Sequence, residues 1–287
     1  MNYILPEAHD HLNFRQFELA VRKLANSLGY GSDPSPFLGS GIDYVQSRLY
    51  VAGDPLKQMD WRITARTGKF HVKEYEAPKQ MPAYIVLDTS ASMCVSSRKL
   101  SKYAISVQIA SGLGLVAQER MSPVGLLGAG ERDLHIKPTL SKARLMQWAH
   151  QLRRFDYKES TNLGAKLRTL MPSLKERAII IVISDFHDDT AMHSLKLLAQ
   201  EHDVIAIEMQ DPAEKGKLKG GFFRAGEAES GMCYISTGRD TFFDVAERGR
   251  QLSKGHVDHL LISTDKPFIP KLRNFLLNRA CFGRGTR

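Results

Sequence analysis

The fold is decided by the stretch Ala83-Tyr84-Ile85-Val86-Leu87-Asp88-Thr89-Ser90-Ala91-Ser92. Its first five residues form a continuous apolar run, which is typical of a buried strand. Directly after that run, Asp88, Ser90 and Ser92 stand at alternate positions on the turn that leaves the strand. Carboxylate and hydroxyl oxygens grouped on one loop are the ligands that Mg²⁺ and Mn²⁺ prefer. The stretch therefore predicts a strand that ends at a metal site.

Beyond residue 83 the chain alternates between apolar strands and helical patterns. Residues 179–183 are all aliphatic, and residues 204–207 are also continuously apolar. Such strands are typical of a parallel sheet covered by helices on both faces. We expect strands at residues 83–87, 124–128, 178–184, 204–209 and 232–236, and helices at residues 99–119, 142–152, 164–171, 191–200, 241–254 and 270–278. The pattern predicts an α/β fold with a doubly wound, mostly parallel sheet.

The first 80 residues have a different character. Residues 13–27 carry apolar side chains at i, i+3 and i+4 spacing, which predicts an amphipathic helix. A loop rich in Gly, Pro and Ser occupies residues 31–41, and residues 39–76 mix short apolar pieces with many charges, which indicates short strands. We therefore divide the chain in two. Residues 1–80 form an N-terminal helix plus a small, mostly β element, and residues 81–287 form the α/β domain with its C-terminal helices.

The composition is that of an ordinary globular protein of 287 residues. Its hydrophobic fraction is 43% and its charged fraction 25%, so a core of normal size is available. The three cysteines are far apart and lack CxxC spacing, which argues against a disulfide framework and against a zinc site. The N-terminus lacks the features of a signal peptide, and no stretch reaches the roughly 18 apolar residues that span a bilayer. We expect a cytoplasmic protein without a membrane span.

Two later polar residues extend the predicted metal site. Thr161 precedes a predicted helix, and Asp185 ends the most apolar strand. Ligands of doubly wound sheets bind at the carboxyl ends of the strands, so these residues are expected at one edge. We predict a Mg²⁺ or Mn²⁺ site made of Asp88, Ser90, Ser92, Thr161 and Asp185, with some ligands acting through water. So few carboxylates would leave the ion electrophilic, able to accept an Asp or Glu from a partner protein.

Each of these residues also has an ordinary structural explanation. Ser90, Ser92 and Thr161 belong to residue types that cap helices, and Asp185 alone is a common residue at a strand end. By composition, a D-x-S-x-S pattern occurs by chance in roughly one chain in ten of this length. All five residues occur in order, each at the edge of a strand or helix, and this joint pattern favours the metal site.

The five residues resemble the metal-ion-dependent adhesion site (MIDAS) of von Willebrand factor A domains, in which D-x-S-x-S is followed by a Thr and then an Asp. The one departure is Ser160, where a Gly often precedes the Thr. The preceding segment resembles the bacterial domain-of-unknown-function 58 family. That likeness rests on Gly39-Ser40-Gly41-Ile42-Asp43-Tyr44, Ser47-Arg48-Leu49-Tyr50, Gly53-Asp54-Pro55, Asp60-Trp61-Arg62, Thr64-Ala65-Arg66-Thr67-Gly68, Asp211-Pro212 and Ser263-Thr264-Asp265-Lys266-Pro267. It runs from about residue 13 to residue 280.

The resemblance implies a von Willebrand factor A-like fold and a role in protein–protein interaction. Members of the family are commonly linked to MoxR-type AAA+ ATPases, so the resemblance implies an adaptor for such an ATPase. Many members carry N-terminal membrane helices, and this chain is similar to the shorter soluble form.

The charged segment before the α/β domain has two interpretations. It could be a recognition surface for a partner, or a set of ion pairs that holds the β element onto the α/β domain. The residues concerned are Arg48, Asp54, Asp60, Arg62 and Arg66. We favour the ion pairs because opposite charges alternate closely, and we expect Trp61 to anchor the two parts to each other.

Two other functions remain open from the sequence. A metal-dependent hydrolase, acting for instance on phosphoesters, would use the same cation, although we find no dedicated base and no G-x-S-x-G motif. A nucleic-acid-binding protein would use the basic residues at positions 62–73 and in the C-terminal tail, residues 271–287, of this chain with a net charge of +9. The first strand lacks the G-x-G-x-x-G of dinucleotide-binding folds, and no phosphate-binding P-loop occurs. We therefore predict no catalytic residues, and we interpret His256 and His259 as a solvated helix end.

Overall fold

A computed structural model describes residues 14–29, 43–76, 81–94, 96–98, 100–131, 134–153, 159–215, 223–226, 233–236 and 245–281. The helices are α1 (Phe14–Gly29), α2 (Trp61–Thr67), α3 (Lys102–Glu119), α4 (Lys142–Leu152), α5 (Leu163–Leu170), α6 (Asp189–Glu201), α7 (Val245–Lys254) and α8 (Phe268–Cys281). The strands are β1 (Asp43–Leu49), β2 (His71–Glu76), β3 (Ala83–Leu87), β4 (Val124–Gly128), β5 (His135–Thr139), β6 (Ile179–Ser184), β7 (Asp203–Gln210), β8 (Phe223–Gly226), β9 (Cys233–Ser236) and β10 (Asp258–Ser263). Among the described residues, no helix is long and apolar enough to cross a membrane.

The main sheet has six strands in the order β10-β7-β6-β3-β4-β5. All neighbouring strands are parallel except β5, which runs antiparallel to β4 at one edge. Within this sheet, the first strand in the sequence is the central β3. The chain then forms β4 and β5 on one side of β3 and crosses to β6 on the other side. The strand order therefore reverses between β3 and β6, which is where doubly wound sheets bind ligands. The predicted α/β fold with a doubly wound, mostly parallel sheet is confirmed.

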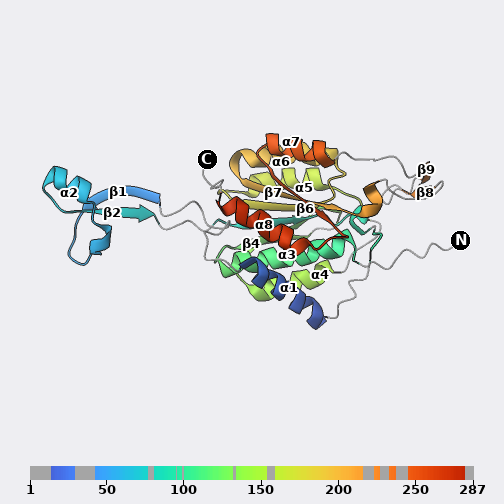
Figure 1. Ribbon diagram of the computed structural model, residues 1–287, viewed down its shortest axis with the longest axis horizontal. Coiled ribbons are helices and arrows are strands. Elements are labelled where there is room, and N and C mark those ends of the chain that lie inside the picture. The colour runs from blue at the N-terminus through green and yellow to red at the C-terminus, as the bar shows by residue number, and fades with distance from the viewer. Residues whose placement is uncertain are drawn as a thin grey trace.

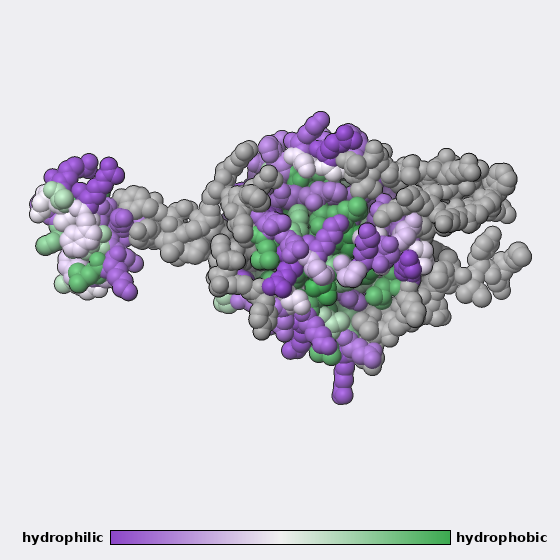
Figure 2. All heavy atoms as spheres, viewed as in Figure 1, coloured by the Kyte–Doolittle hydropathy of each residue, from purple (hydrophilic) through white to green (hydrophobic). Residues whose placement is uncertain are grey.

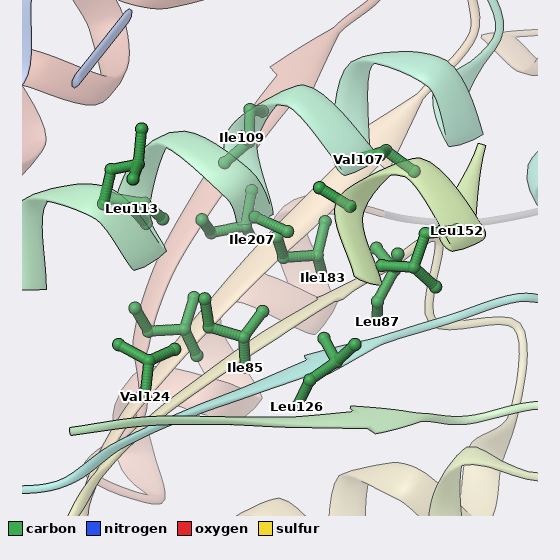
Figure 3. Packing of buried hydrophobic residues seen from close by; sticks show 14 of the residues in the cluster. Ile85, Leu87, Val107, Ile109, Leu113, Val124, Leu126, Leu152, Ile183 and Ile207 are labelled. Atoms are coloured by element: carbon green, nitrogen blue, oxygen red, sulfur yellow. The ribbon is translucent and has the colours of Figure 1, made fainter. Parts of the chain in front are cut away.

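Both faces of the sheet are buried because alternate residues of each strand enter separate cores. Ile85 and Leu87 of β3 belong to one core, and Tyr84 and Val86 belong to the other. Figure 3 shows the first core, in which Ile85, Leu87 and Ile183 lie beneath Val107 and Ile109 of α3. Helix α3 is buried over nearly its whole length because it lies between the sheet and two other helices, α1 and α4.

Helices cover the two faces as the fold requires (Figure 1). Helices α1, α3, α4 and α8 pack on one face, and α5, α6 and α7 pack on the other. Phe17, Val21 and Ala25 of α1 are members of the same core as β3. Helix α1 thus belongs structurally to the α/β domain, although the sequence pattern grouped it with residues 1–80.

Most strand and helix expectations are confirmed, but β5, β8, β10 and the short helix α2 were not predicted. Strand β5 is a short edge strand with polar residues at alternate positions, and β10 is an edge strand with only three consecutive apolar residues, 260–262. The predicted strand at residues 232–236 exists as β9, but it pairs with β8 in a separate hairpin rather than with the main sheet. Several predicted parts lie outside the described residues: the loop at residues 31–41, Lys99, Met232, and residues 241–244.

The predicted small β element is an antiparallel pair of strands, β1 and β2, together with the short helix α2. We call residues 43–76 the β1–β2 module. Asp60 begins α2 by accepting hydrogen bonds from the backbone N–H groups of Arg62 and Ile63, and Gly68 ends the helix in the left-handed conformation, with φ of 70°. Figure 1 shows the module apart from the α/β domain.

Candidate metal centre

The loops after β3 and β6 bring four of the five predicted residues together at the reversal point of the sheet. The Ser90 Oγ and Ser92 Oγ atoms lie 3.0 Å apart. The Asp88 carboxylate accepts hydrogen bonds from the Ser90 backbone N–H at 3.0 Å and from the Ser184 hydroxyl at 2.6 Å. The Ser92 hydroxyl also hydrogen-bonds the Asp185 carboxylate. The D-x-S-x-S loop and Asp185 therefore form one connected group of oxygen atoms.

The loop that carries Thr161 is held beside this group. The backbone N–H of Ala91 donates to the carbonyl of Glu159 at 2.7 Å, and the N–H of Asn162 donates to the carbonyl of Ala129 at 3.0 Å. The buried Glu159 carboxylate also accepts a 2.8 Å hydrogen bond from the Thr89 hydroxyl. These contacts fix residues 159–162 against the start of the D-x-S-x-S loop, and Thr161 itself is half-buried there.

The chemistry of the donor set fits a small hard cation. Octahedral Mg²⁺ binds oxygen at about 2.1 Å, so two ligands at right angles lie about 3.0 Å apart. That is the separation of the Ser90 and Ser92 hydroxyl oxygens. Asp88 and Asp185 are both buried, at 1% and 3% exposed, so water does little to stabilise their charges. A divalent cation would balance this charge.

Burial governs the protonation of the two carboxylates. Burial, together with the negative charge of Asp185, raises the pKa of Asp88 to about 7. Burial would also raise the pKa of Asp185, but the charges of Lys102 and His187 outweigh it and lower that pKa below its usual value. Asp185 is therefore the carboxylate that stays ionised, and Asp88 is the one that exchanges a proton near neutral pH.

Lys102 was not predicted, and it completes the site from the first turn of α3. Its side chain is 0% exposed, and its Nζ atom lies 2.8 Å from Asp185 Oδ2. It also forms an ion pair with Glu214, which follows β7. Burial would lower the pKa of Lys102, but the two carboxylates raise it, so the side chain stays charged. A lysine is rarely buried, and its two partners are 83 and 112 residues away, so the sequence offered no signal.

Asp185, His187 and Glu214 place ligand atoms within 4.8 Å of one another, which is close enough to hold a metal ion. The Lys102 ammonium, however, already bonds both carboxylates of this group. It supplies the positive charge there, so these three residues need no second cation. His187 lies 3.5 Å from Asp185 and belongs to the surroundings of that carboxylate.

The loop that carries Asp185 is fixed by hydrogen bonds from α7. Phe186 has a left-handed backbone conformation with φ of 54°, which is unusual for a residue with a side chain. Arg248 of α7 donates hydrogen bonds of 2.8 Å to the carbonyls of both Asp185 and Phe186. Arg248 also lies 3.5 Å from Glu208, which bonds His259 at 2.7 Å. The interpretation of His259 as part of a solvated helix end was wrong, because it lies on β10 and contacts a buried carboxylate.

Arg48, Asp54 and Asp60 form their contacts within the β1–β2 module. Arg48 forms a two-pronged ion pair with Asp54, with both N–O distances at 2.7 Å, and approaches Glu74 at 3.7 Å. Asp60 accepts from Ser47 at 2.7 Å in addition to capping α2. These contacts lie within the module. The sequence-based expectation that they join the module to the α/β domain was wrong. Trp61 is 65% exposed, so it does not anchor the two parts.

Three kinds of comparison relate the chain to known proteins. It is 26% identical over 223 residues to uncharacterized proteins of Mycobacterium bovis and Mycobacterium tuberculosis, covering 76% of this chain and 70% of each relative. A solved structure described as conserved hypothetical protein BatB from Bacteroides thetaiotaomicron aligns with a TM-score of 0.48 and 14% identity, covering 70% of this chain and 99% of that one. The family model described as protein of unknown function DUF58 matches residues 46–246. Because that match covers more than half of the chain, this protein belongs to the DUF58 family.

Proposed function

We propose that this protein is a metal-dependent protein–protein interaction module. Asp88, Ser90, Ser92, Thr161 and Asp185 would hold Mg²⁺, or Mn²⁺, and the bound ion would supply an electrophile for an Asp or Glu side chain of a partner. The observation that carries the proposal is the 3.0 Å separation of the Ser90 and Ser92 hydroxyl oxygens between two buried carboxylates. It supports the proposal because it matches neighbouring ligands of an octahedral ion.

The charge balance at the site favours binding over catalysis. Lys102 offsets the charge of Asp185, which leaves Asp88 as the carboxylate available to the cation. A divalent ion held by one carboxylate and neutral hydroxyls keeps net positive charge, and this charge attracts an outside carboxylate. Buried Lys102 is held charged by two acids, so it is not free to act as a base.

The partner that we propose is a MoxR-type AAA+ ATPase, for which the protein would act as an adaptor. This choice rests on the family resemblance of the sequence. An acidic residue of the ATPase, or of the client that the adaptor presents, would complete the coordination of the ion. Binding of the partner would then depend on whether the site at the carboxyl end of the sheet holds the metal ion.

Isothermal titration of Mg²⁺ into metal-free protein tests the site itself. We expect the wild type to release heat with a 1:1 stoichiometry, and the Ser90→Ala/Ser92→Ala variant to lose this signal, because alanine removes both hydroxyl ligands without adding bulk. Ser173→Ala is a matched control, since that hydroxyl only bonds the carbonyl of Leu170 in another loop. Equal heats for all three proteins would refute the metal site.

Binding to a purified MoxR-type ATPase from the same genome tests the partner. AAA+ ATPases need Mg²⁺ for their own nucleotide, so removing the metal with a chelator would affect both proteins. The informative comparison is therefore wild type against Ser90→Ala/Ser92→Ala at constant Mg²⁺, measured by surface plasmon resonance. We expect the variant to bind at least tenfold more weakly, and equal binding would assign the metal a structural role.

A further inference from the structure

Among the residues of the β1–β2 module whose burial is described, more large apolar side chains are exposed than buried. Five large apolar side chains there are more than half exposed: Leu49 at 54%, Val51 at 62%, Leu56 at 69%, Trp61 at 65% and Phe70 at 59%. Met59 and Val72 are its buried apolar side chains among the residues with described burial. An isolated two-stranded hairpin is only marginally stable in water, so this surface is suited to being covered.

Two acidic residues of the module have partners within it, whereas two arginines of α2 are exposed. Asp54 is paired with Arg48, and Asp60 is 6% exposed because it caps α2. Arg62 and Arg66 are exposed, and no ion pair involves either of them among the described residues. Asp54 and Asp60 are thus engaged by contacts within the module, whereas Arg62 and Arg66 of α2 are exposed.

The exposed residues of α2 form one helical face. Trp61 and Ala65 are four residues apart in one row, and Arg62 and Arg66 are four residues apart in the next row. Two arginines at this spacing repel each other, and a carboxylate placed between them would relieve the repulsion. Trp and Arg are also the residues that most often dominate the energy of protein interfaces. Figure 2 shows pale and green residues across the module, bordered by purple ones.

We propose that this face of the module docks an acidic, apolar segment of another protein. Carboxylates of that segment would bind Arg62 and Arg66, and its apolar side chains would cover Trp61 together with neighbouring residues of the module. Trp61 and Phe70 could stack on nucleic-acid bases, but aliphatic side chains offer no ring for stacking. The exposed Leu49 and Leu56 therefore favour an apolar protein segment over a nucleic acid. The surface is separate from the metal centre, and its test does not depend on any metal.

The fluorescence of Trp61 can report on this docking directly. The chain has two tryptophans, and Trp148 is 2% exposed in the core, so a change in emission on binding comes from Trp61. The probe is a synthetic 14-residue amphipathic peptide of Glu and Leu, added to the full chain in EDTA. Two comparison probes are a peptide with Lys in place of each Glu and a 14-nucleotide single-stranded DNA. We expect a saturable blue shift with the Glu peptide alone, and no shift in Trp61→Phe.

Charge reversal locates the binding surface. Arg62→Glu/Arg66→Glu is expected to weaken binding of the Glu peptide by about tenfold or more, because charged pairs at an interface discriminate between partners. The matched control is Arg250→Glu/Lys254→Glu, which makes the same change at the same spacing on α7. Hydrogen exchange of the Asp60 amide, which donates to the carbonyl of His71 at 2.8 Å, checks that the module remains folded.

Four outcomes would overturn the proposal. No shift with the Glu peptide would remove the docking surface, and equal weakening in both double variants would reduce it to general charge attraction. Binding of the DNA with loss in Arg62→Glu/Arg66→Glu would assign the face to nucleic acid. A shift that appears on concentrating the protein without any probe would assign the face to a second copy of the chain.

Discussion

The carboxyl end of the main sheet, where β3 and β6 stop, and the β1–β2 module both pair cations with carboxylates, but one pair is buried and the other is exposed. At the sheet edge the side chains of Lys102 and Asp185 are 0% and 2% exposed, whereas in the module those of Arg48 and Asp54 are 41% and 16% exposed. Water and salt screen the exposed pair, while removing one member of a buried pair leaves an isolated charge. The comparison teaches that burial, more than the distance between the charged atoms, decides how much stability is lost when one member of an ion pair is removed.

Apolar residues differ between the two regions in the same way. The α/β domain covers both faces of its sheet, and even the N-terminal helix α1 contributes to that core. Among the residues of the module whose burial is described, five large apolar side chains are exposed and two are buried. This contrast is the basis of the docking surface proposed for the module.

The largest expected effect is at Lys102. Lys102→Met should lower the free energy of unfolding by about 3–5 kcal/mol, because the substitution removes the buried cation that pairs with both Asp185 and Glu214. Urea unfolding in EDTA, followed by circular dichroism, measures it without interference from Mg²⁺. Arg48→Met is the comparison in the module, and we expect little change in its unfolding midpoint. If both variants unfolded at the wild-type midpoint, the contrast between the two regions would be wrong.

The next effect concerns the packing of α1. Leu24→Ala should destabilise the protein by about 2–5 kcal/mol, because Leu24 is 2% exposed and packs against α3. Leu56→Ala, at an apolar side chain that is 69% exposed, should change stability by less than about 0.5 kcal/mol. Thermal unfolding of both variants gives the comparison.

A double-mutant cycle makes the Leu24 test specific. A Cβ atom added at Gly112 would lie 2.7 Å from Leu24 Cδ2, so Gly112→Ala alone should overpack the contact. Combined with Leu24→Ala, the same alanine has room, and the double variant should be more stable than the sum of the single effects predicts. Simple additivity would show that α1 does not pack on α3 as described.

The smallest effect is the response of the module to acid. The side-chain hydrogen bond from Arg48, with that from the Val51 backbone, lowers the pKa of Asp54 to about 2 from an ordinary value of 3.8. A carboxyl group with a lowered pKa stabilises the fold above pH 3.8, and this contribution is lost as the pH falls through about 2. Hydrogen exchange at Val51, whose amide donates to Asp54 at 2.9 Å, should therefore accelerate between pH 4 and pH 2. Asp54→Asn should remove that additional acceleration, after correction for the intrinsic exchange rate, and its persistence would exclude Asp54 as the cause.

Much of the fold could be predicted because its signals are local. The five apolar residues before Asp88 and the aliphatic run of β6 identify the buried strands without any knowledge of their neighbours. Strand β5 was missed because it exposes alternate residues and resembles a loop in composition, and β10 was missed because its apolar run is only three residues long. The position of α1 was missed because an amphipathic pattern shows that a helix has a buried face, but not which surface covers it.

The sequence by itself determined the identity and order of the candidate ligands, since D-x-S-x-S, Thr161 and Asp185 each follow a strand or precede a helix. It also determined that their strands would end at one edge, because parallel strands share their direction. Only the tertiary structure decided that Lys102 is buried against Asp185 and Glu214, and that Trp61 faces water. The reason is physical: local patterns depend on neighbours along the chain, whereas the burial of one side chain depends on elements that only the complete fold brings together.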